Sequence, residues 1–404
     1  MMSCAKEVED PMVALERRML ELESGVSGFQ EEEREAAVAE EEEEEDTFTA
    51  EIDNIMNGRL YDDKISEKEL MEKYPVYFSL PNKELVAETA YPDGKTEYSN
   101  TEIHITRWRS NQSNIPHSIK KISTNNPSSL IIQNNFFEYN SLSGYSSWYP
   151  NFAHQCLFTA WDSALLAQDE LQVLEFPCLA ALHSFLPSHG SLTVDSISPS
   201  PVLIQNAIRR CALDTISLPS IYGNQFRLAS KELILNRLTI LNPIIKSNIY
   251  AMEAPSSGYG YYKKYQILSI LSTAYTAFSN IVQMENEKYK NNNGNNSSNN
   301  ENNMKKKKKK NSNESNNSVI PVEIHIGYWG CGAYGGNSVL MILIQLLALK
   351  LSNVSNVVIH GSPNVSYAEK AIDIFENDIP LNNTEDAINW IEKQKFKWGV
   401  SDGN

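Results

Sequence analysis

Apolar and polar positions along this chain follow two alternating patterns, short β-branched runs and longer stretches with helical spacing. The runs predict strands at Ser129–Gln133, Pro201–Gln205, Asn248–Met252, Val319–Ile326 and Asn356–His360. The helical spacing predicts helices at Ser163–Leu174, Tyr265–Glu287, Ser338–Leu351, Ala368–Asn377 and Thr384–Lys395. Strands that alternate with helices predict an α/β domain, whose largely parallel or mixed sheet is covered by helices on both faces.

Two segments have no such pattern. Residues 1–50 carry 17 Asp or Glu against four Lys or Arg, which predicts a disordered acidic tail. Residues 291–318 contain 13 Asn and a run of six Lys, which predicts a long loop inserted between a helix and a strand. The Lys run is typical of a nuclear import signal or a nucleic-acid patch, but it is also typical of simple repeats without function.

These segments divide the chain into three parts. We expect the tail at 1–50, a short accessory segment at 51–118 and a domain at 119–404 that carries the insertion 291–318. The formal net charge is −16, and residues 1–50 account for −13 of it. The rest of the chain is therefore nearly neutral, so it does not repel an anionic ligand and lacks the strongly basic surface that direct DNA binding needs.

Composition also limits the compartment and the metal chemistry. The sequence contains no stretch of 18 apolar residues, so it predicts no membrane helix and no membrane partner. The acidic start resembles neither a secretory signal nor a transit peptide, and we expect an intracellular protein of the nucleus or the cytoplasm. The cysteines stand far apart without a CxxC pair, which argues against a disulfide framework and a zinc site.

The segment 327–337 is rich in glycine and lies between a predicted strand and a predicted helix. Glycines at 327, 330, 332, 335 and 336 let the backbone approach a ligand closely. The N–H groups and the dipole of the following helix then predict an anion site suited to a diphosphate. The alternative is a tight turn that packs under Trp329 and Tyr334.

Gly330, Gly332 and Gly335 also satisfy G-x-G-x-x-G, the fingerprint of dinucleotide-binding folds. That fingerprint needs an acid about 20 residues later, at the end of the next strand. The next predicted strand ends in VVIHGS and carries no carboxylate. A Rossmann-type NAD enzyme is therefore disfavoured.

Gln168, Asp169 and Glu170 interrupt an otherwise apolar helical stretch. Successive helical residues project about 100° apart, so the two acids cannot share one face. An acid that enters an apolar surface has a raised pKa and can hold a proton near neutrality, as a general acid must. The alternative is a solvated face with both acids exposed.

Taken together, these segments resemble the catalytic macrodomain of the poly(ADP-ribose) glycohydrolase family. The segment 329–336 reads WGCGAYGG where the family has WGCGAFGG, and 168–170 reads QDE where the family has QEE. Asn151–His154 stands in the place of D-F-A-N, Ser220–Gly223 near T-G-Y-A, and Ala274–Phe278 matches A-Y-x-x-F. The resemblance spans roughly residues 120–400 and implies a macrodomain-like mixed sheet between helices.

The resemblance also implies roles for individual residues. Glu170 would be the catalytic acid, and Asp169 would hydrogen-bond ribose hydroxyls. Contacts to the adenine side would come from Gln168 and Phe152, with His360 near an adenine-stacking position, and Asn151 would bind substrate. The diphosphate and adjoining ribose would be held by Gly330, Gly332, Ala333, Tyr334, Gly335 and Tyr222. The implied partners are poly(ADP-ribose) or ADP-ribosylated proteins, and no cofactor is implied.

One departure from the family leaves two functions open. Phe158-Thr159-Ala160, followed by Trp161, stands where the family has three glycines that approach the scissile ribose. Bulky side chains there are expected to reshape or partly block the pocket. The first hypothesis is an ADP-ribose glycohydrolase that acts through Glu170, and the second is a macrodomain module that binds ADP-ribose without cleaving it.

Overall fold

The computed structural model describes residues 58–119, 129–139, 144–186, 194–195, 198–256, 258–298, 321–354 and 356–403. The predicted acidic tail at 1–50 lies outside these residues. So does the Lys run at 305–310. The helix before that run continues to Ser298, eight residues into the tract that was expected to be a loop.

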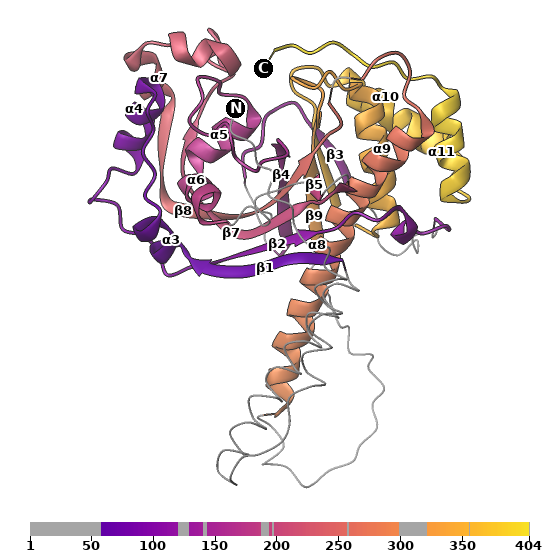
Figure 1. Ribbon diagram of the computed structural model, residues 1–404, viewed down its shortest axis with the longest axis horizontal. Helices are drawn as coiled ribbons and strands as arrows, with labels where there is room; N and C mark the ends of the chain where they lie inside the picture. The colour runs from indigo at the N-terminus through magenta and orange to yellow at the C-terminus, as the bar shows by residue number, and fades with distance from the viewer. Residues whose placement is uncertain are drawn as a thin grey trace, which may run out of the picture. The chain divides into compact units, whose positions relative to one another are not determined.

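An eight-stranded mixed sheet forms the centre of the described part of the chain (Figure 1). The strand order is β1 (Arg59–Ser66), β2 (Glu102–Trp108), β7 (Val202–Leu213), β8 (Leu238–Glu253), β4 (Ser146–Ala153), β9 (Val322–Ile326), β10 (Asn356–His360) and β3 (Ser129–Gln133). Strands β8, β4, β9, β10 and β3 pair in parallel, whereas β2, β7 and β8 pair antiparallel. A separate two-stranded ladder joins β5 (Val194–Asp195) and β6 (Ser198–Pro199). The predicted mixed sheet is confirmed.

Helices cover both faces of this sheet (Figure 1). One face carries α8 (Lys264–Ser298), α9 (Ser338–Leu351), α10 (Ser366–Asp373) and α11 (Thr384–Lys393). The other carries α3 (Glu67–Lys73), α5 (Gln168–Glu175) and α6 (Pro177–Phe185), with α4 (Pro81–Ala90) and α7 (Lys231–Arg237) in an adjoining cluster. Three shorter turns complete the elements at Gln112–Asn114, Gly223–Leu228 and Ile374–Asp378.

Helix α9 shows why this layering is stable. All but two of its 14 residues are buried, because the sequence SVLMILIQLLALKL is apolar around the whole helix. A helix that is apolar on every side must lie between other elements. Among the described residues, no helix has both the length and the apolar character needed to cross a membrane.

The helix predicted at Ser163–Leu174 begins later than expected, at Gln168. Residues 156–163 instead form successive turns, with backbone bonds such as Trp161 N to Phe158 O at 3.1 Å. Leu166 then pairs with the distant Gly223 through two backbone hydrogen bonds of 2.9 and 3.3 Å. This non-local pairing competes with the helix and delays its start until the acidic residues.

Strands β1 and β2 come from the region 51–118 that the sequence assigns to an accessory segment. Both belong to the same sheet as the strands of the main domain. Residues of both strands also lie in the core cluster that contains α3 and α6, among them Ile65, Ile103 and Ile105. The described part of 51–118 therefore contributes to the central sheet, and the domain boundaries themselves stay a prediction.

Candidate functional site

A cleft of about 490 Å³ brings together the two segments that the sequence singles out. It lies where the parallel strands β4, β8, β9 and β10 end, which is the usual ligand-binding edge of such sheets. The first turn of α5 forms one wall, and the glycine loop 327–337, which connects β9 to α9, forms the other. Segments more than 150 positions apart in the sequence thus face one space.

Ten of the twelve sequence-predicted site residues line this cleft: Phe152, Gln168, Asp169, Glu170, Tyr222, Gly330, Gly332, Ala333, Tyr334 and His360. The other two, Asn151 and Gly335, lie behind its walls.

The acid pair is largely withdrawn from water. Burial first, and the adjacent Glu170 charge second, raise the pKa of Asp169 to about 7. Burial also raises the pKa of Glu170, which is only 5% exposed. Glu170 Oε2 accepts the backbone N–H of Ala167 at 3.0 Å and so closes the first turn of α5. The pair can therefore hold a proton near neutral pH, which a general acid requires.

Asn151 holds the acid pair from behind. This side chain is 1% exposed, and its Nδ2 donates to Asp169 Oδ1 at 2.8 Å and to Gln172 Oε1 at 2.9 Å. Gln168 ties the same helix to β4, since its Oε1 accepts the N–H of Phe152 at 2.8 Å and its Nε2 donates to Pro150 O at 2.9 Å. Both side chains therefore fix α5 against β4 and orient Asp169.

Lys83 is a residue of the site that sequence reasoning missed. Its side chain comes from α4, is fully buried, and donates from Nζ to the carbonyl of Trp161 at 2.7 Å. Burial lowers the pKa of Lys83 to about 8, although the nearby charges of Glu170, Asp162 and Asp169 oppose that shift. A cation behind the acid pair favours the ionised carboxylates, and no local sequence pattern indicates it.

The glycine loop is held in shape by its own backbone. Gly336 N donates to Gly330 O at 2.8 Å, and Gly335 N donates to Gly332 O at 3.0 Å. Gly330 has a φ of +70°, and a Cβ at this position would lie 2.3 Å from the Cβ of Ala254. Only glycine fits there without a shift of the backbone, so the loop is specified at the level of the main chain.

The end of the described chain packs against this loop. Gly399 N donates to Gly335 O at 2.8 Å, and a Cβ on Gly335 would lie 3.0 Å from Ser401 N. Asp402 follows and lines the cleft. Gly335 therefore serves the contact with residues 399–401 as well as the turn itself.

The segment that replaces three glycines directs its largest side chains away from the cleft. Phe158 adopts a φ of 58°, a backbone conformation that favours glycine, and its ring is fully buried in the core. Trp161 packs edge-on against Phe78 at 5.1 Å between ring centroids. Only the smaller Thr159 and Ala160 line the cleft. The chain thus keeps a glycine-like backbone while it directs its two largest side chains into the core.

A buried chain of polar side chains runs from the sheet to the cleft wall. Glu323 and His325 lie two residues apart on one face of β9, and His360 ends the neighbouring β10. His325 Nε2 lies 3.1 Å from Glu323 Oε1, His325 Nδ1 lies 2.9 Å from His360 Nε2, and His360 Nδ1 lies 3.2 Å from Asn135 O. The alternation VEIHI, with two polar residues on one face of an apolar strand, is the sequence signal that could have revealed it.

Burial and the neighbouring groups set the charges at the two ends of this row of side chains. Burial first, and His325 second, lower the pKa of His360 to about 3, so His360 is neutral near pH 7. Burial raises the pKa of Glu323, but hydrogen bonds from His325 and Ser147 outweigh it and the net shift is downward. A carboxylate at Glu323 and a neutral imidazole at His360 therefore stand on either side of His325.

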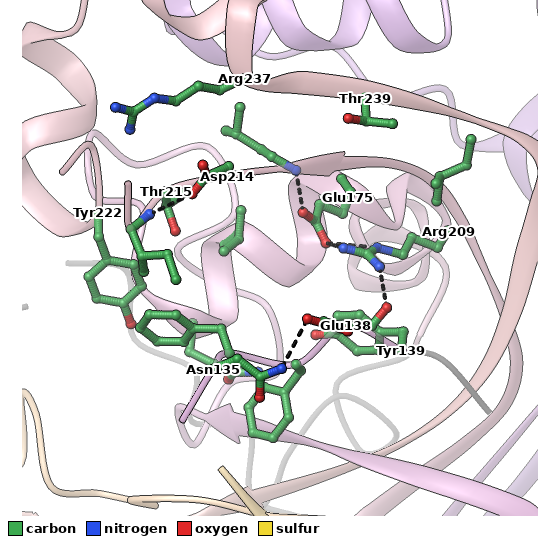
Figure 2. Close-up of a pocket in the computed structure, with 18 of the residues that line it drawn as sticks. Asn135, Glu138, Tyr139, Glu175, Arg209, Asp214, Thr215, Tyr222, Arg237 and Thr239 are labelled. Atoms are coloured by element: carbon green, nitrogen blue, oxygen red, sulfur yellow. Dashed lines mark hydrogen bonds and ion pairs between the residues drawn. The ribbon is translucent and has the colours of Figure 1, made fainter. Parts of the chain in front are cut away.

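A second cavity, of about 400 Å³, adjoins the cleft (Figure 2). Asn135, Phe136, Phe137, Gln168 and Tyr222 line both spaces. The rings of Phe136 and Tyr222 stack with centroids 5.4 Å apart at 25°. Figure 2 shows Glu175 and Arg209 on one side of this second cavity and Asp214, Thr215 and Arg237 toward the other.

Comparisons with known proteins agree with the sequence motifs. Residues 205–362 match the family model described as poly(ADP-ribose) glycohydrolase (PARG), macro domain fold. The match begins in β7, includes Tyr222 and the glycine loop, and ends just after β10. The acid-bearing turn 168–170 lies before it. The predicted resemblance to this family is confirmed.

A solved structure also aligns with the chain. It is the poly(ADP-ribose) glycohydrolase of Deinococcus radiodurans in complex with ADP-ribose, at 9% identity and a TM-score of 0.34, covering 80% of this chain and 97% of that one. A search of curated protein sequences found no match.

Proposed function

We propose that this chain is an ADP-ribose glycohydrolase, which hydrolyses the O-glycosidic bond at the ribose C1″ of poly(ADP-ribose) or of protein-linked ADP-ribose. The observation that carries the proposal is the pair Asp169–Glu170, with raised pKa values, across one cleft from a glycine loop that leads into a helix. The family match over residues 205–362 supports the ligand class. The proposed site of action is the nucleus or the cytoplasm.

In the proposed mechanism the glycine loop and the start of α9 hold the diphosphate. Backbone N–H groups and the helix dipole at Ser338 supply the positive end of that contact. Tyr334 covers the adjoining ribose from the same loop, and Tyr222 contacts the ligand from the opposite side of the cleft. Phe152, Gln168 and His360 form the proposed adenine side.

Glu170 is the proposed general acid. It protonates the oxygen that leaves C1″ and, as a carboxylate, then removes a proton from the water that attacks the oxocarbenium-like centre. Asp169 accepts hydrogen bonds from the ribose hydroxyls, oriented by Asn151 at 2.8 Å. Thr159 and Ala160 form the floor near this end.

Glu170→Gln tests the proposal directly, because it preserves the shape of the side chain and removes the proton donor. Release of ADP-ribose from ADP-ribosylated protein is expected to fall about 100-fold or more, while ADP-ribose affinity by calorimetry stays within about threefold. Glu232→Gln, at an exposed acid in α7, is the matched control. Unchanged release by the Glu170 variant would contradict the assignment.

A second candidate function is a binding module without turnover. The observation that favours it is that Thr159 and Ala160 present side chains to the cleft where the family has glycine. An assay of the wild-type protein distinguishes the two functions. Binding of ADP-ribose without release from either poly- or mono-ADP-ribosylated substrates would select the module.

A further inference from the structure

Residues 258–266 and 393–400 lie side by side and form a surface outside the lining of the cleft. Tyr261 faces Lys397 in an antiparallel bridge, and a backbone hydrogen bond of 3.0 Å lies on each side of that bridge. Neighbouring residues of an extended chain point to opposite sides. The bridge therefore fixes which side chains of the two segments share a face.

The inner side of these two segments is packed into the protein. The rings of Tyr262 and Trp398 stack with centroids 4.1 Å apart at 14°, and both residues belong to or contact the core cluster that contains α8 and α9. Gly258 lies so close to this stack that a Cβ on it would be 1.8 Å from Trp398 Cε2. The inner aromatic residues thus anchor the backbone from which the outer side chains project.

The outer side carries exposed tyrosines and lysines. Tyr259 is 100% exposed, Tyr265 is 68% exposed and Tyr261 is 42% exposed. Lys397 Nζ lies 5.5 Å from the centroid of the Tyr261 ring, so rings and amines share this face. The exposed lysines of the two segments are Lys263, Lys393, Lys395 and Lys397.

This surface has a local excess of positive charge. Neither segment contains Asp or Glu, and within the described residues none of the four exposed lysines makes an ion pair. The nearest acids are engaged by Lys264, whose N–H donates to Glu392 Oε1 at 2.9 Å and whose Nζ pairs with Glu385. Five lysines against two acids leave a formal charge of +3 here, whereas the whole chain carries −16. The expectation of no direct DNA binding rested on an average that conceals this face.

Exposed rings among amines suit a polymer that carries both bases and phosphates. Unpaired bases stack on aromatic rings, and lysine amines follow the phosphates of a single strand. An acidic protein segment would use the amines and leave the rings in water, and a duplex keeps its bases inside its own stack. A polynucleotide also has one phosphate for each base, which matches three rings and four amines.

We propose that this surface binds single-stranded nucleic acid without sequence preference. Tyr259, Tyr261 and Tyr265 stack on unpaired bases, and the four exposed lysines contact the phosphates. The surface does not line the proposed catalytic cleft. The inference therefore goes beyond the proposed function and does not depend on it.

The test follows the fluorescence anisotropy of a labelled oligouridine of about 15 nucleotides, titrated with the full-length wild-type chain at several salt concentrations. With three or four phosphate contacts, the logarithm of the binding constant is expected to fall against the logarithm of the salt concentration with a slope of about −2 to −3. The double variant Lys263→Gln/Lys397→Gln is expected to reduce that slope by about 1.4, since each contact to a single strand contributes about 0.7.

Tyr259→Ala tests the rings separately from the charges. It is expected to weaken binding about fivefold or more at every salt concentration and to leave the slope unchanged, because stacking releases no counterions. A surface that only attracts anions would show no loss with this variant.

Two exposed residues elsewhere provide matched controls. Lys68→Gln lies in α3, which belongs to the layer on the opposite face of the sheet, and Tyr77→Ala removes a tyrosine that is 63% exposed. Both are expected to bind oligouridine like wild type. All the substituted side chains are exposed, so melting temperatures within about 3 °C of wild type are expected for every variant.

Competition identifies the occupant. Unlabelled oligouridine and oligothymidine are expected to displace the probe, whereas an RNA duplex and polyglutamate of equal charge are expected to compete about tenfold less well. The proposal is overturned by an absence of binding, by an affinity that does not depend on Tyr259, or by equal competition from the duplex or polyglutamate. Tighter binding of poly(ADP-ribose) at this surface also overturns it. None of these outcomes affects the glycohydrolase proposal, which the Glu170→Gln assay tests.

Discussion

The glycine loop at 327–337 and the acid-bearing first turn of α5 face the same cleft, but different parts of the molecule hold them. The loop keeps its shape through backbone hydrogen bonds between its own glycines, and it leaves no room for a Cβ at Gly330. The acid pair is held by Asn151 from β4, 18 positions before Asp169, and is influenced by the charge of Lys83 from α4. A motif in which the backbone makes the structure can be read locally, whereas a motif made by side chains depends on its neighbours in space.

The largest expected effect concerns the loop side of this comparison. Gly330→Ala is expected to lower the free energy of unfolding by about 3 kcal/mol, because positive φ strain adds to a contact of 2.3 Å with the Ala254 Cβ. Gly94→Ala is the matched control, since Gly94 has a φ of +65° but open space around it. It is expected to cost about 1 kcal/mol. If both variants lose the same free energy of unfolding in urea, the steric contact at Gly330 does not determine the shape of the loop.

The next prediction concerns the acid side. The pKa of Asp169 is raised from 3.8 to about 7, so the folded protein keeps a proton that the unfolded chain releases. The associated stability is fully present below pH 3.8 and is lost as the pH rises through about 7. Asp169→Asn removes this dependence, and its stability relative to wild type is expected to increase by about 3 kcal/mol between pH 4 and pH 7.

The matched control for that titration is Asp214→Asn. The pKa of Asp214 is lowered, so its small contribution is present at neutral pH and is lost on acidification. The two variants must therefore show opposite trends when unfolding is followed at several pH values. Parallel trends would mean that the pKa of Asp169 is not raised in the folded protein.

The smallest expected effect concerns the buried row of Glu323, His325 and His360, which ends at the wall of the cleft. His325→Asn breaks the hydrogen bonds that fix His360 against Asn135, so ADP-ribose affinity is expected to fall about threefold. Nitrogen NMR of the imidazoles gives a direct readout, because the lowered pKa predicts that the His360 ring of the wild type is neutral at neutral pH. His183→Asn, which removes a bond to Leu157 O away from the cleft, is the control. A doubly protonated His360 ring in the wild type at neutral pH would contradict this arrangement.

The sequence predicted those elements whose pattern is local. Helix α9 is a continuous apolar run and β10 is largely apolar, and both were predicted with the observed bounds, whereas β9 was expected from Val319 and begins at Val322. Strand β4 was not foreseen, because its Pro150 is typical of an edge or a loop. In the structure β4 nevertheless lies inside the sheet, paired with β8 on one side and β9 on the other.

The site shows the same limit. The positions of Glu170 and Gly330 could be predicted, since family motifs mark them. The roles of Lys83 and His325 could not be predicted, because each depends on neighbours that the fold brings from other elements. The direction of the Phe158 side chain could not be predicted for a related reason: it depends on φ, and the sequence does not reveal a φ of 58° at a phenylalanine.

The packing of residues 399–402 against the glycine loop has a practical consequence for experiments on this protein. Gly399 bonds to Gly335, and Asp402 lies on the cleft lining itself. An affinity tag or fluorophore attached close to Asp402 would sit beside this cleft, so it would perturb binding measurements or report on them. Immobilisation through a long spacer, or through an exposed surface position away from the cleft, keeps that edge free.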